Sequence, residues 1–242
     1  MRRITLCMAY YQNAGMLKEQ LARIRALARK LLDQICVIVV DDGSPDGEAA
    51  GEQIGCPFSI YRIDVDVRWN QDAARNIAVA NSNTQWLLLT DMDHIVSQGA
   101  WSRILERKLH KMMVYRFSRA TLEPNGKITP YKPHPNSWLM TRAMYDLIGG
   151  YDERFAGHYG TDAEFRDRVA KTTAIEMLEE YLIRVPRETI ADASTRNYVR
   201  KGAPEDSGAI ARIKADRALD PNWKTKRLSF PYRQIYSSGF RD

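Results

Sequence analysis

The chain has 242 residues, 44% of them hydrophobic and 27% charged, which is typical of a globular protein with one large α/β domain or two small ones. No apolar run approaches the ~20 residues of a membrane helix, and the N-terminus lacks a secretion signal, so we expect a cytoplasmic protein. The formal net charge of +6 lies in residues 196–242, where eleven Lys or Arg residues stand against five acids.

Strands alternate with helices in the first part of the chain. Apolar runs predict strands over residues 4–10, 36–40, 58–65 and 85–90, and apolar residues at helical spacing predict helices over 16–32 and 71–82. The run CVIVV is apolar throughout, as expected for a strand buried on both faces. This alternation predicts an α/β fold with a mostly parallel central sheet and helices on both faces.

The second half of the chain is less regular. Helices are expected over residues 98–112, 142–150, 161–171 and 203–219, and strands over 113–119 and 136–141. A glycine pair closes the second of these helices, and Thr161 is a candidate N-cap for the third. Residues 175–186 fit either a helix or a strand, and the tail from Pro221 is expected to be irregular.

Polar and aromatic side chains follow three of the predicted strands. They are Tyr10-Tyr11, Asp41-Asp42 and Asp91-Met92-Asp93. In a parallel sheet the carboxyl ends of the strands meet at one edge, where ligands bind. The sequence therefore predicts a ligand site built from these three segments.

Two Asp-x-Asp triplets occur in the chain, Asp64-Val65-Asp66 and Asp91-Met92-Asp93, and the pattern alone has little specificity. The second triplet follows the most apolar predicted strand, at the expected ligand edge. Hard divalent cations prefer oxygen ligands, and Mg²⁺ or Mn²⁺ commonly takes one or two carboxylates plus substrate phosphates. The two carboxylates either share one ion, or one binds the ion and the other a ribose hydroxyl. The three cysteines show no CxxC pairing, which argues against zinc.

Three segments in this order resemble GT-A-fold glycosyltransferases, most nearly those of family 2. They are VIVVDDGSPD, WNQDAARNIAVANSNTQWLLLTDMDH and LIGGYDERFAGHYGTDAEFRDRV, and the resemblance covers roughly residues 4–170. It implies a nucleoside diphosphate sugar donor, a UDP- or GDP-sugar, with Mn²⁺ or Mg²⁺ and a hydroxyl acceptor on a glycan or glycoconjugate. It also implies a single GT-A domain over 1–242, with a nucleotide-sugar half at 1–96, an acceptor and catalytic half at 97–195 and a basic lid or tail at 196–242.

The resemblance assigns roles residue by residue. Ala9, Tyr10 and Tyr11 would line the base pocket, Asp42 would bind the base, Arg75 the nucleotide or its phosphates, Asp91 the ribose or sugar, Asp93 the metal, and Asp162 would be the catalytic base. Transfer needs charge stabilisation on the leaving diphosphate and a base for the acceptor proton. A base opposite the leaving group favours inversion at the anomeric carbon. Asp162 by itself is equally well explained as an acid at a helix N-terminus.

The chain departs from the family pattern at two places. Thr161 stands where relatives often have Glu, which weakens the inferred acceptor contact. No histidine follows His158, so the late histidine that many relatives give to the metal is missing, and Asp192 is a candidate instead. His94 is expected to support the site rather than bind the ion. Trp138, His158 and Tyr159 are candidate acceptor contacts, although lone aromatic residues usually belong to the core.

The basic C-terminal segment has two interpretations. Arg196, Arg200 and Lys201 are expected in a lid that closes over the donor diphosphate. Alternatively, the wider segment contacts a polyanionic acceptor, modified DNA among them, or the inner face of a membrane. Two other protein classes also fit a nucleotide-binding sheet, a nucleotidyltransferase and a non-catalytic nucleotide-binding module. The first usually has a glycine-rich basic loop after strand one, which YYQNAGMLKEQ lacks.

Overall fold

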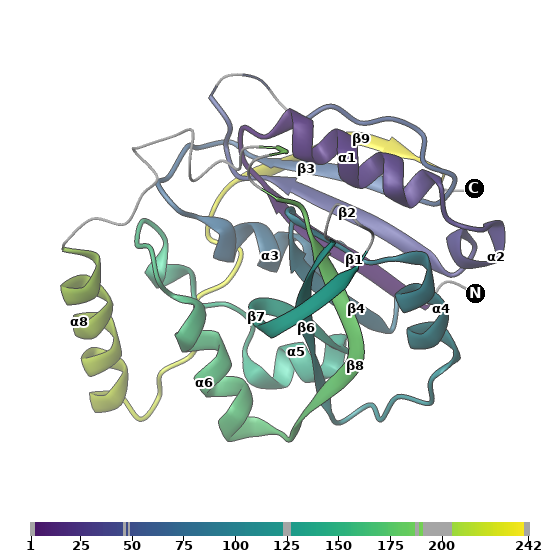
Figure 1. The fold of residues 1–242 in the computed structure, drawn as a ribbon. Coiled ribbons are helices and arrows are strands. Elements are labelled where there is room, and N and C mark those ends of the chain that lie inside the picture. Colours follow the sequence, from purple (N-terminus) through teal and green to yellow (C-terminus); the bar gives the residue numbers. More distant parts are fainter. Residues whose placement is uncertain are drawn as a thin grey trace.

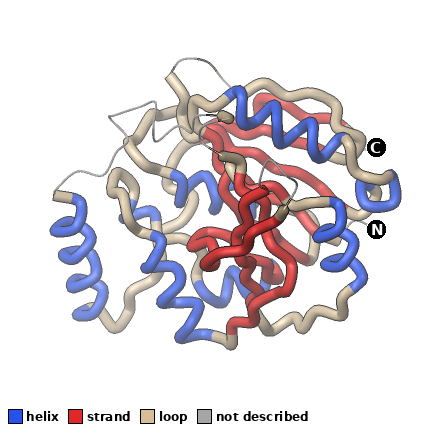
Figure 2. The backbone as a smooth tube through the Cα atoms, in the orientation of Figure 1, coloured by secondary structure: helices blue, strands red, loops and turns tan. Residues whose placement is uncertain are grey.

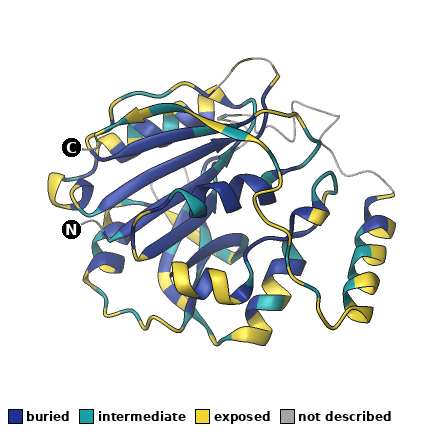
Figure 3. Ribbon diagram, turned by 180° about the vertical axis from the view of Figure 1, so that it is seen from behind, coloured by how far each residue is buried: buried dark blue, intermediate teal, exposed yellow. Residues whose placement is uncertain are grey.

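The computed structural model describes residues 3–45, 47, 49–122, 127–186, 189–190 and 205–239. Within these residues a single nine-stranded sheet runs through the molecule in the order β5-β8-β6-β7-β4-β1-β2-β3-β9, with helices packed against it (Figures 1 and 2). The central strands are buried, whereas β9 (Tyr232–Ser238) has no buried residue and α8 (Asp206–Leu219) is largely exposed (Figure 3).

The first half of the chain builds the parallel part of the sheet. Its strands are β1 (Ile4–Tyr10), β2 (Ile35–Asp41), β3 (Phe58–Ile63) and β4 (Trp86–Asp91), and its helices are α1 (Ala14–Arg25), α2 (Arg29–Leu32) and α3 (Gln71–Ala80). β1 pairs in parallel with β2 and β4, and β2 pairs in parallel with β3. Ala9 lies opposite both Val40 and Asp91, so the carboxyl ends of these strands meet at one edge, as predicted.

Alternate residues of β1 enter two separate apolar cores because successive strand side chains point to opposite faces. Leu6 and Met8 pack with α1, and Cys7 packs with α3. The two helices therefore cover opposite faces of the sheet (Figure 1). The predicted α/β fold class with helices on both faces is confirmed.

The second half of the chain extends the sheet with antiparallel pairs. Its elements are β5 (His94–Ile95), α4 (Gln98–Glu106), β6 (Val114–Leu122), β7 (Ile128–Thr141), α5 (Arg142–Ile148), the 3₁₀ helix η1 (Glu153–Phe155), α6 (Asp162–Thr172), β8 (Ile175–Arg184), α8 (Asp206–Leu219) and β9 (Tyr232–Ser238). β7 runs antiparallel to β4 and β6, and β8 runs parallel to β6. The sheet is parallel at its centre and mixed beyond β4.

Several element boundaries differ from the sequence expectation. The predicted helix at 16–32 is interrupted before α2, where the extended backbone of Ala28 donates its N–H to Gln98 at 3.0 Å. The predicted helix at 98–112 ends at Glu106. Residues 175–184 form a strand, because pairing with β6 and an alternating burial pattern favour the extended backbone. Gly149 ends α5 in the left-handed conformation (φ 93°), as the glycine pair predicted.

The tail beyond Pro221 is ordered, and the expectation of an irregular tail is wrong for β9, which pairs antiparallel with β3. Tertiary contacts hold the segment that leads to it. Glu153 accepts hydrogen bonds from the backbone N–H groups of Leu228 and Ser229, at 2.7 Å each. The neighbouring Asp152 accepts from the Trp223 indole at 3.0 Å and from the Lys226 N–H at 3.1 Å. Both acids are buried.

None of the helices in the described ranges combines the length and apolar character needed to span a bilayer.

The first testable prediction concerns Glu153, which also accepts a bond from the Asn76 amide at 2.7 Å. Glu153→Ala removes the acceptor of three donors, of which the Asn76 amide is buried and the Leu228 and Ser229 N–H groups belong to exposed residues, and we expect it to lower the free energy of unfolding by about 1–3 kcal/mol. Urea denaturation measures this change. Glu52→Ala is the control, because its carboxylate forms an exposed ion pair with Arg25, worth less than about 1 kcal/mol. Equal losses in the two variants would contradict the role of Glu153.

Candidate active site

A cavity of about 560 Å³ opens at the carboxyl ends of β1, β2 and β4. Eight of the residues predicted for the site line it: Ala9, Tyr10, Tyr11, Asp42, Asp91, Asp93, Tyr159 and Asp162. Further residues on its wall come from the hairpin of β6 and β7, namely Arg119, Tyr131, Lys132, His134, Pro135 and Asn136. The cavity thus joins the two halves of the chain at the predicted edge.

Of the two aspartates at the end of β2, only Asp42 lines the cavity. Asp41 is turned into the fold, where it accepts hydrogen bonds from the N–H groups of Ser44 and Ala49 and from Arg62, at 2.9 to 3.0 Å. Asp42 is buried and accepts from the Asn70 N–H at 3.2 Å. Asp41 is therefore committed to holding the loop, and Asp42 is the acid presented to a ligand.

Asp91 is surrounded by groups that stabilise its negative charge. Its carboxylate accepts from Arg75 at 2.6 Å and from the Asn136 amide at 3.2 Å, and it lies 3.4 Å from the His134 ring. Burial alone would raise the pKa of Asp91, but Arg75 above all, then the two histidines and Asn136, outweigh it and hold the pKa well below its usual range. Asp91 is an anion at any physiological pH.

Arg75 does not line the cavity, and its expected contact with the nucleotide or its phosphates stays a prediction. Its side chain is 1% exposed and lies over the Tyr151 ring at 5.0 Å. Its guanidinium bonds Asp91 at 2.6 Å and Asp72 at 3.3 Å. In this arrangement Arg75 is linked to the cavity through its ion pair with Asp91.

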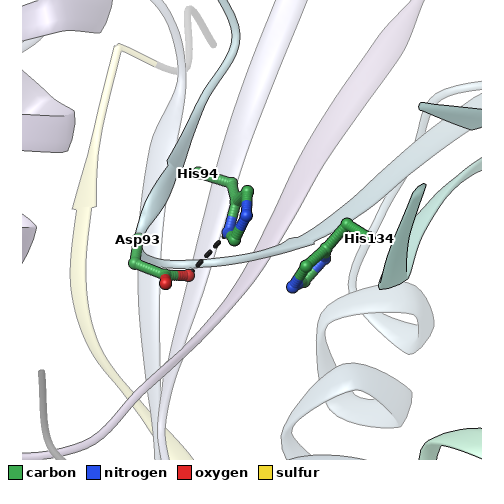
Figure 4. A group of neighbouring side chains, drawn as sticks. All are labelled: Asp93, His94 and His134. Atoms are coloured by element: carbon green, nitrogen blue, oxygen red, sulfur yellow. Dashed lines mark hydrogen bonds and ion pairs between the residues drawn. The ribbon is translucent and has the colours of Figure 1, made fainter. Parts of the chain in front are cut away.

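Asp93, His94 and His134 form a candidate metal centre (Figure 4). One ligand atom from each lies within 4.8 Å of the others, and Asp93 is 2.6 Å from His94 Nδ1. The buried His94 Nε2 has no hydrogen-bond partner in the part of the chain that the structure describes. Burial lowers the pKa of His134 to about 4, against the opposing charge of Asp91, so its ring is neutral and can bind a cation at pH 7.

This donor set fits a divalent cation. One carboxylate and two imidazoles suit a first-row transition ion such as Mn²⁺ better than Mg²⁺, which prefers oxygen ligands. The sequence alone does not point to His134, because it lies some forty residues from Asp93, in β7, and only the pairing of the sheet brings the two together. His94, expected only to support the site, belongs to the cluster itself.

Asp162 begins α6 and lines the cavity. Burial raises the pKa of Asp162, although Arg75 opposes this, and the carboxylate thereby comes closer to the range of a general base.

Thr161 does not cap the helix with its side chain. Its hydroxyl instead donates to Asp72 at 3.2 Å. Burial raises the pKa of Asp72 to about 7, with Arg75 opposing.

The three candidate acceptor contacts have different surroundings. Trp138 is fully buried in the core beneath Arg116, so the prediction that it stacks on a sugar is wrong. His158 lies 3.3 Å from Asp206 and is not on the cavity wall. Tyr159 is 49% exposed, packs edge-on against Trp69 and lines the cavity. Arg196, Arg200, Lys201 and Asp192 lie outside the described residues.

The second prediction concerns Asp72. Because its folded-state pKa is above the ~3.9 of an unfolded chain, the protonated form is favoured by folding, and the stability that Asp72 contributes is lost as the pH rises toward 7. We expect the difference in unfolding free energy, Asp72→Asn minus wild type, to increase by about 1–3 kcal/mol between pH 5 and pH 8. Urea titrations at both pH values measure it. Asp167→Asn, an exposed change on α6, should show no such trend; a flat difference for Asp72→Asn would contradict the buried carboxyl.

The model of glycosyl transferase family 2 matches residues 5–154. No curated protein sequence matches the chain. Among solved structures, residues 1–349 of S. aureus TarS have a TM-score of 0.59 at 12% identity, covering 92% of this chain and 67% of that one. The same TarS fragment with UDP-GlcNAc has a TM-score of 0.58 at 14% identity, covering 92% and 68%. A structure of S. aureus TarS has a TM-score of 0.55 at 13% identity, covering 92% of this chain and 40% of that one. These likenesses show a shared fold, and the family match shows that the chain belongs to glycosyl transferase family 2.

Proposed function

We propose that this glycosyltransferase is metal-dependent and inverting, and that it transfers a sugar from a UDP- or GDP-sugar to a hydroxyl of a glycan or glycoconjugate. The observation that carries the proposal is the convergence of Asp91, Asp93 and Asp162 on one cavity. Asp162 lies beyond residues 5–154, so its role rests on this placement and not on the family match.

The donor is proposed to lie along the edge formed by β1, β2 and β4. Ala9, Tyr10 and Tyr11 offer an apolar and aromatic wall for a base, and Asp42 offers a carboxylate acceptor for its N–H groups. A UDP-sugar is favoured, because the similarly folded TarS is described in complex with UDP-GlcNAc. Thermal-shift measurements with UDP- and GDP-sugars, each with and without Mn²⁺, test donor class and metal together.

The metal is proposed to bind at Asp93, His94 and His134, with Asp91 beside it. A divalent ion there would neutralise charge on the departing diphosphate. Asp91 is held by Arg75 and Asn136, which leaves its orientation fixed toward the cavity for a sugar or ribose hydroxyl. Asp93 differs from Asp91, because among the described residues His94 is the only basic residue that bonds it.

Asp162 is proposed to take the proton of the acceptor hydroxyl as that oxygen attacks the anomeric carbon and the bond to the diphosphate breaks. The raised pKa of a buried carboxylate suits this task, because a base of higher pKa accepts a proton more readily. Tyr159, exposed at the rim of the same cavity, is the remaining aromatic candidate for contact with the acceptor.

Two alternatives are distinguished by products. A nucleotidyltransferase would release pyrophosphate rather than a nucleoside diphosphate, and a binding module would release neither. A polyanionic acceptor such as modified DNA is an alternative to a neutral glycan.

The proposed lid of Arg196, Arg200 and Lys201 would contact the donor diphosphate. Loss of nucleotide affinity in a triple alanine variant would support it.

The third prediction concerns the metal. Asp93→Ala removes the only carboxylate of the three clustered ligands, and we expect it to abolish the Mn²⁺-dependent part of nucleoside diphosphate binding, measured by calorimetry with and without the ion. Asp64→Ala is the control, because Asp64 belongs to the other triplet and pairs with Arg233. Asp66 is unsuitable, since it accepts a bond from Tyr11 at 3.2 Å. Equal losses in the two variants would reject the assignment.

The fourth prediction concerns the base. Asp162→Asn keeps the shape of the side chain but cannot accept the proton, so we expect donor affinity to be unchanged and sugar transfer to fall by ~10²–10⁴. Nucleoside diphosphate release in the presence of acceptor measures the rate. Asp167→Asn, on the exposed side of α6, should transfer at the wild-type rate. Turnover of Asp162→Asn near that of wild type would move the base elsewhere.

A further inference from the structure

A second cavity of about 560 Å³ lies between the end of α5, the second half of α6, α8 and the segment that leads to β9. It is lined by Asp146, Leu147, Ile148, Gly149, Arg168, Lys171, Arg217, Trp223, Lys224, Thr225 and Arg227. We call it the basic pocket, because five cationic side chains and one carboxylate face it. Its residues come from two parts of the sequence that are separated by about fifty positions. The distribution of charge along the sequence did not identify this group.

Two acids balance only part of this charge. Glu164 bonds Arg168, at 2.7 and 2.8 Å, and also Arg217. Asp146 pairs with Arg227 at 2.8 Å. Lys171 and Lys224 are exposed and have no ion-pair partner among the described residues. Five cations against two acids leave the pocket with a local charge of about +3, which attracts anions.

The wall that carries Lys224 and Arg227 is fastened to the fold rather than loose. Arg154 donates to the Lys224 carbonyl at 2.8 Å, and its guanidinium lies 4.0 Å from the Trp223 ring centroid. The Thr225 hydroxyl donates to the Gly149 carbonyl. Together with the hydrogen bonds that Asp152 and Glu153 accept, these contacts fix the backbone that carries Lys224 and Arg227 before any ligand arrives, which lowers the entropic cost of binding.

The basic pocket is joined to the candidate active site by two helices. α6 carries Asp162 at its start and Lys171 near its end, about 13 Å apart along the axis at 1.5 Å per residue. A third cavity, lined by Tyr159, Gly160 and one face of α8, lies between the two; its α8 residues are Asp206, Ser207, Ile210, Ala211 and Lys214. Arg217, one turn further along α8, belongs to the basic pocket. Tyr159 is shared with the active-site cavity.

We propose that the basic pocket binds phosphodiester groups of the acceptor, so that a phosphodiester-linked chain with its reactive hydroxyl at Asp162 runs past Tyr159 and along α8. This rests on the proposed function, since it names the acceptor class of the same site. A concave pocket walled by α8 and α6 suits a chain that enters it, whereas an anionic membrane presents a flat surface. The phosphodiester chemistry is common to nucleic acids and to polyol phosphate polymers.

The test uses the whole chain and two labelled probes, a single-stranded oligodeoxynucleotide and a glycerol phosphate oligomer of equal charge, followed by fluorescence anisotropy over a range of salt. We expect Lys171→Ala/Lys224→Ala to weaken binding of at least one probe by about tenfold or more. The slope of log affinity against log salt should shrink by about 1 to 2, since two phosphate contacts are lost. Whichever probe the wild type prefers identifies the source of the phosphodiester.

Lys18→Ala/Lys30→Ala is the matched control. It removes the same charge from exposed positions on α1 and α2, at the opposite end of the molecule from α8, and it should bind as the wild type does (Figure 1). Unchanged binding in the basic-pocket variant, equal weakening in both variants, or binding to anionic phospholipid vesicles but to neither probe would each overturn the proposal.

Donor binding is measured separately, as the thermal shift with UDP-GlcNAc and Mn²⁺, and does not depend on the acceptor. No donor shift in the wild type would overturn the proposed donor site while leaving the anion-binding result standing. A donor shift in the wild type with phosphodiester binding insensitive to Lys171 and Lys224 would overturn only the basic pocket. Thermal denaturation of the double variant should match wild type, since neither lysine is buried or paired within the described residues.

Discussion

A guanidinium enclosed between two carboxylates organises the centre of this molecule. Arg75 is buried against Asp72 and Asp91, and taking such charges out of water costs several kcal/mol per ion unless they are paired. One cation serves both acids. The pKa of Asp91 is held low, while burial raises the pKa of Asp72 so that it can keep its proton. This uneven sharing lets several acids crowd one cavity without mutual repulsion forcing them apart, and it leaves Asp93 and Asp162 to face a ligand.

The residue next to Arg75, Asn76, links the same helix to the C-terminal part of the fold. Asn76 donates to the Tyr151 carbonyl at 2.9 Å and to Glu153 at 2.7 Å, and Glu153 in turn holds the backbone at Leu228 and Ser229. Two adjacent residues of α3 therefore connect the strand end that carries Asp91 with the segment that leads to β9. The walls of the active-site cavity and of the basic pocket depend on the same short helix, so the donor edge and the basic wall are parts of one rigid arrangement.

The alternating elements of the first half were predictable because local patterns decide them. CVIVV is apolar at every position and became β2, buried throughout, and the polar ends after β1, β2 and β4 met at one edge because parallel pairing requires it. Where the local pattern was weak, the sequence left the element open or, for the tail beyond Pro221, predicted it wrongly. Residues 175–184 fit either a helix or a strand by sequence, with charges at Glu176, Glu179, Glu180 and Arg184, and only pairing with β6 selected the strand. β9 is a strand because β3 had a free edge to pair with.

For the site, the sequence by itself determined which acids could matter: Asp42, Asp91 and Asp93 lie at the ends of apolar strands, and the resemblance to family 2 pointed to Asp162. All four line the same cavity. Tertiary structure alone decided what each one touches. It buried Arg75 away from the cavity, sealed Trp138 in the core and brought His134 to Asp93 and His94 across a sheet pairing. It also gathered Lys171 and Lys224 into one pocket from distant parts of the chain. Periodicity and polarity are local properties, whereas burial and charge pairing depend on neighbours that no local segment contains.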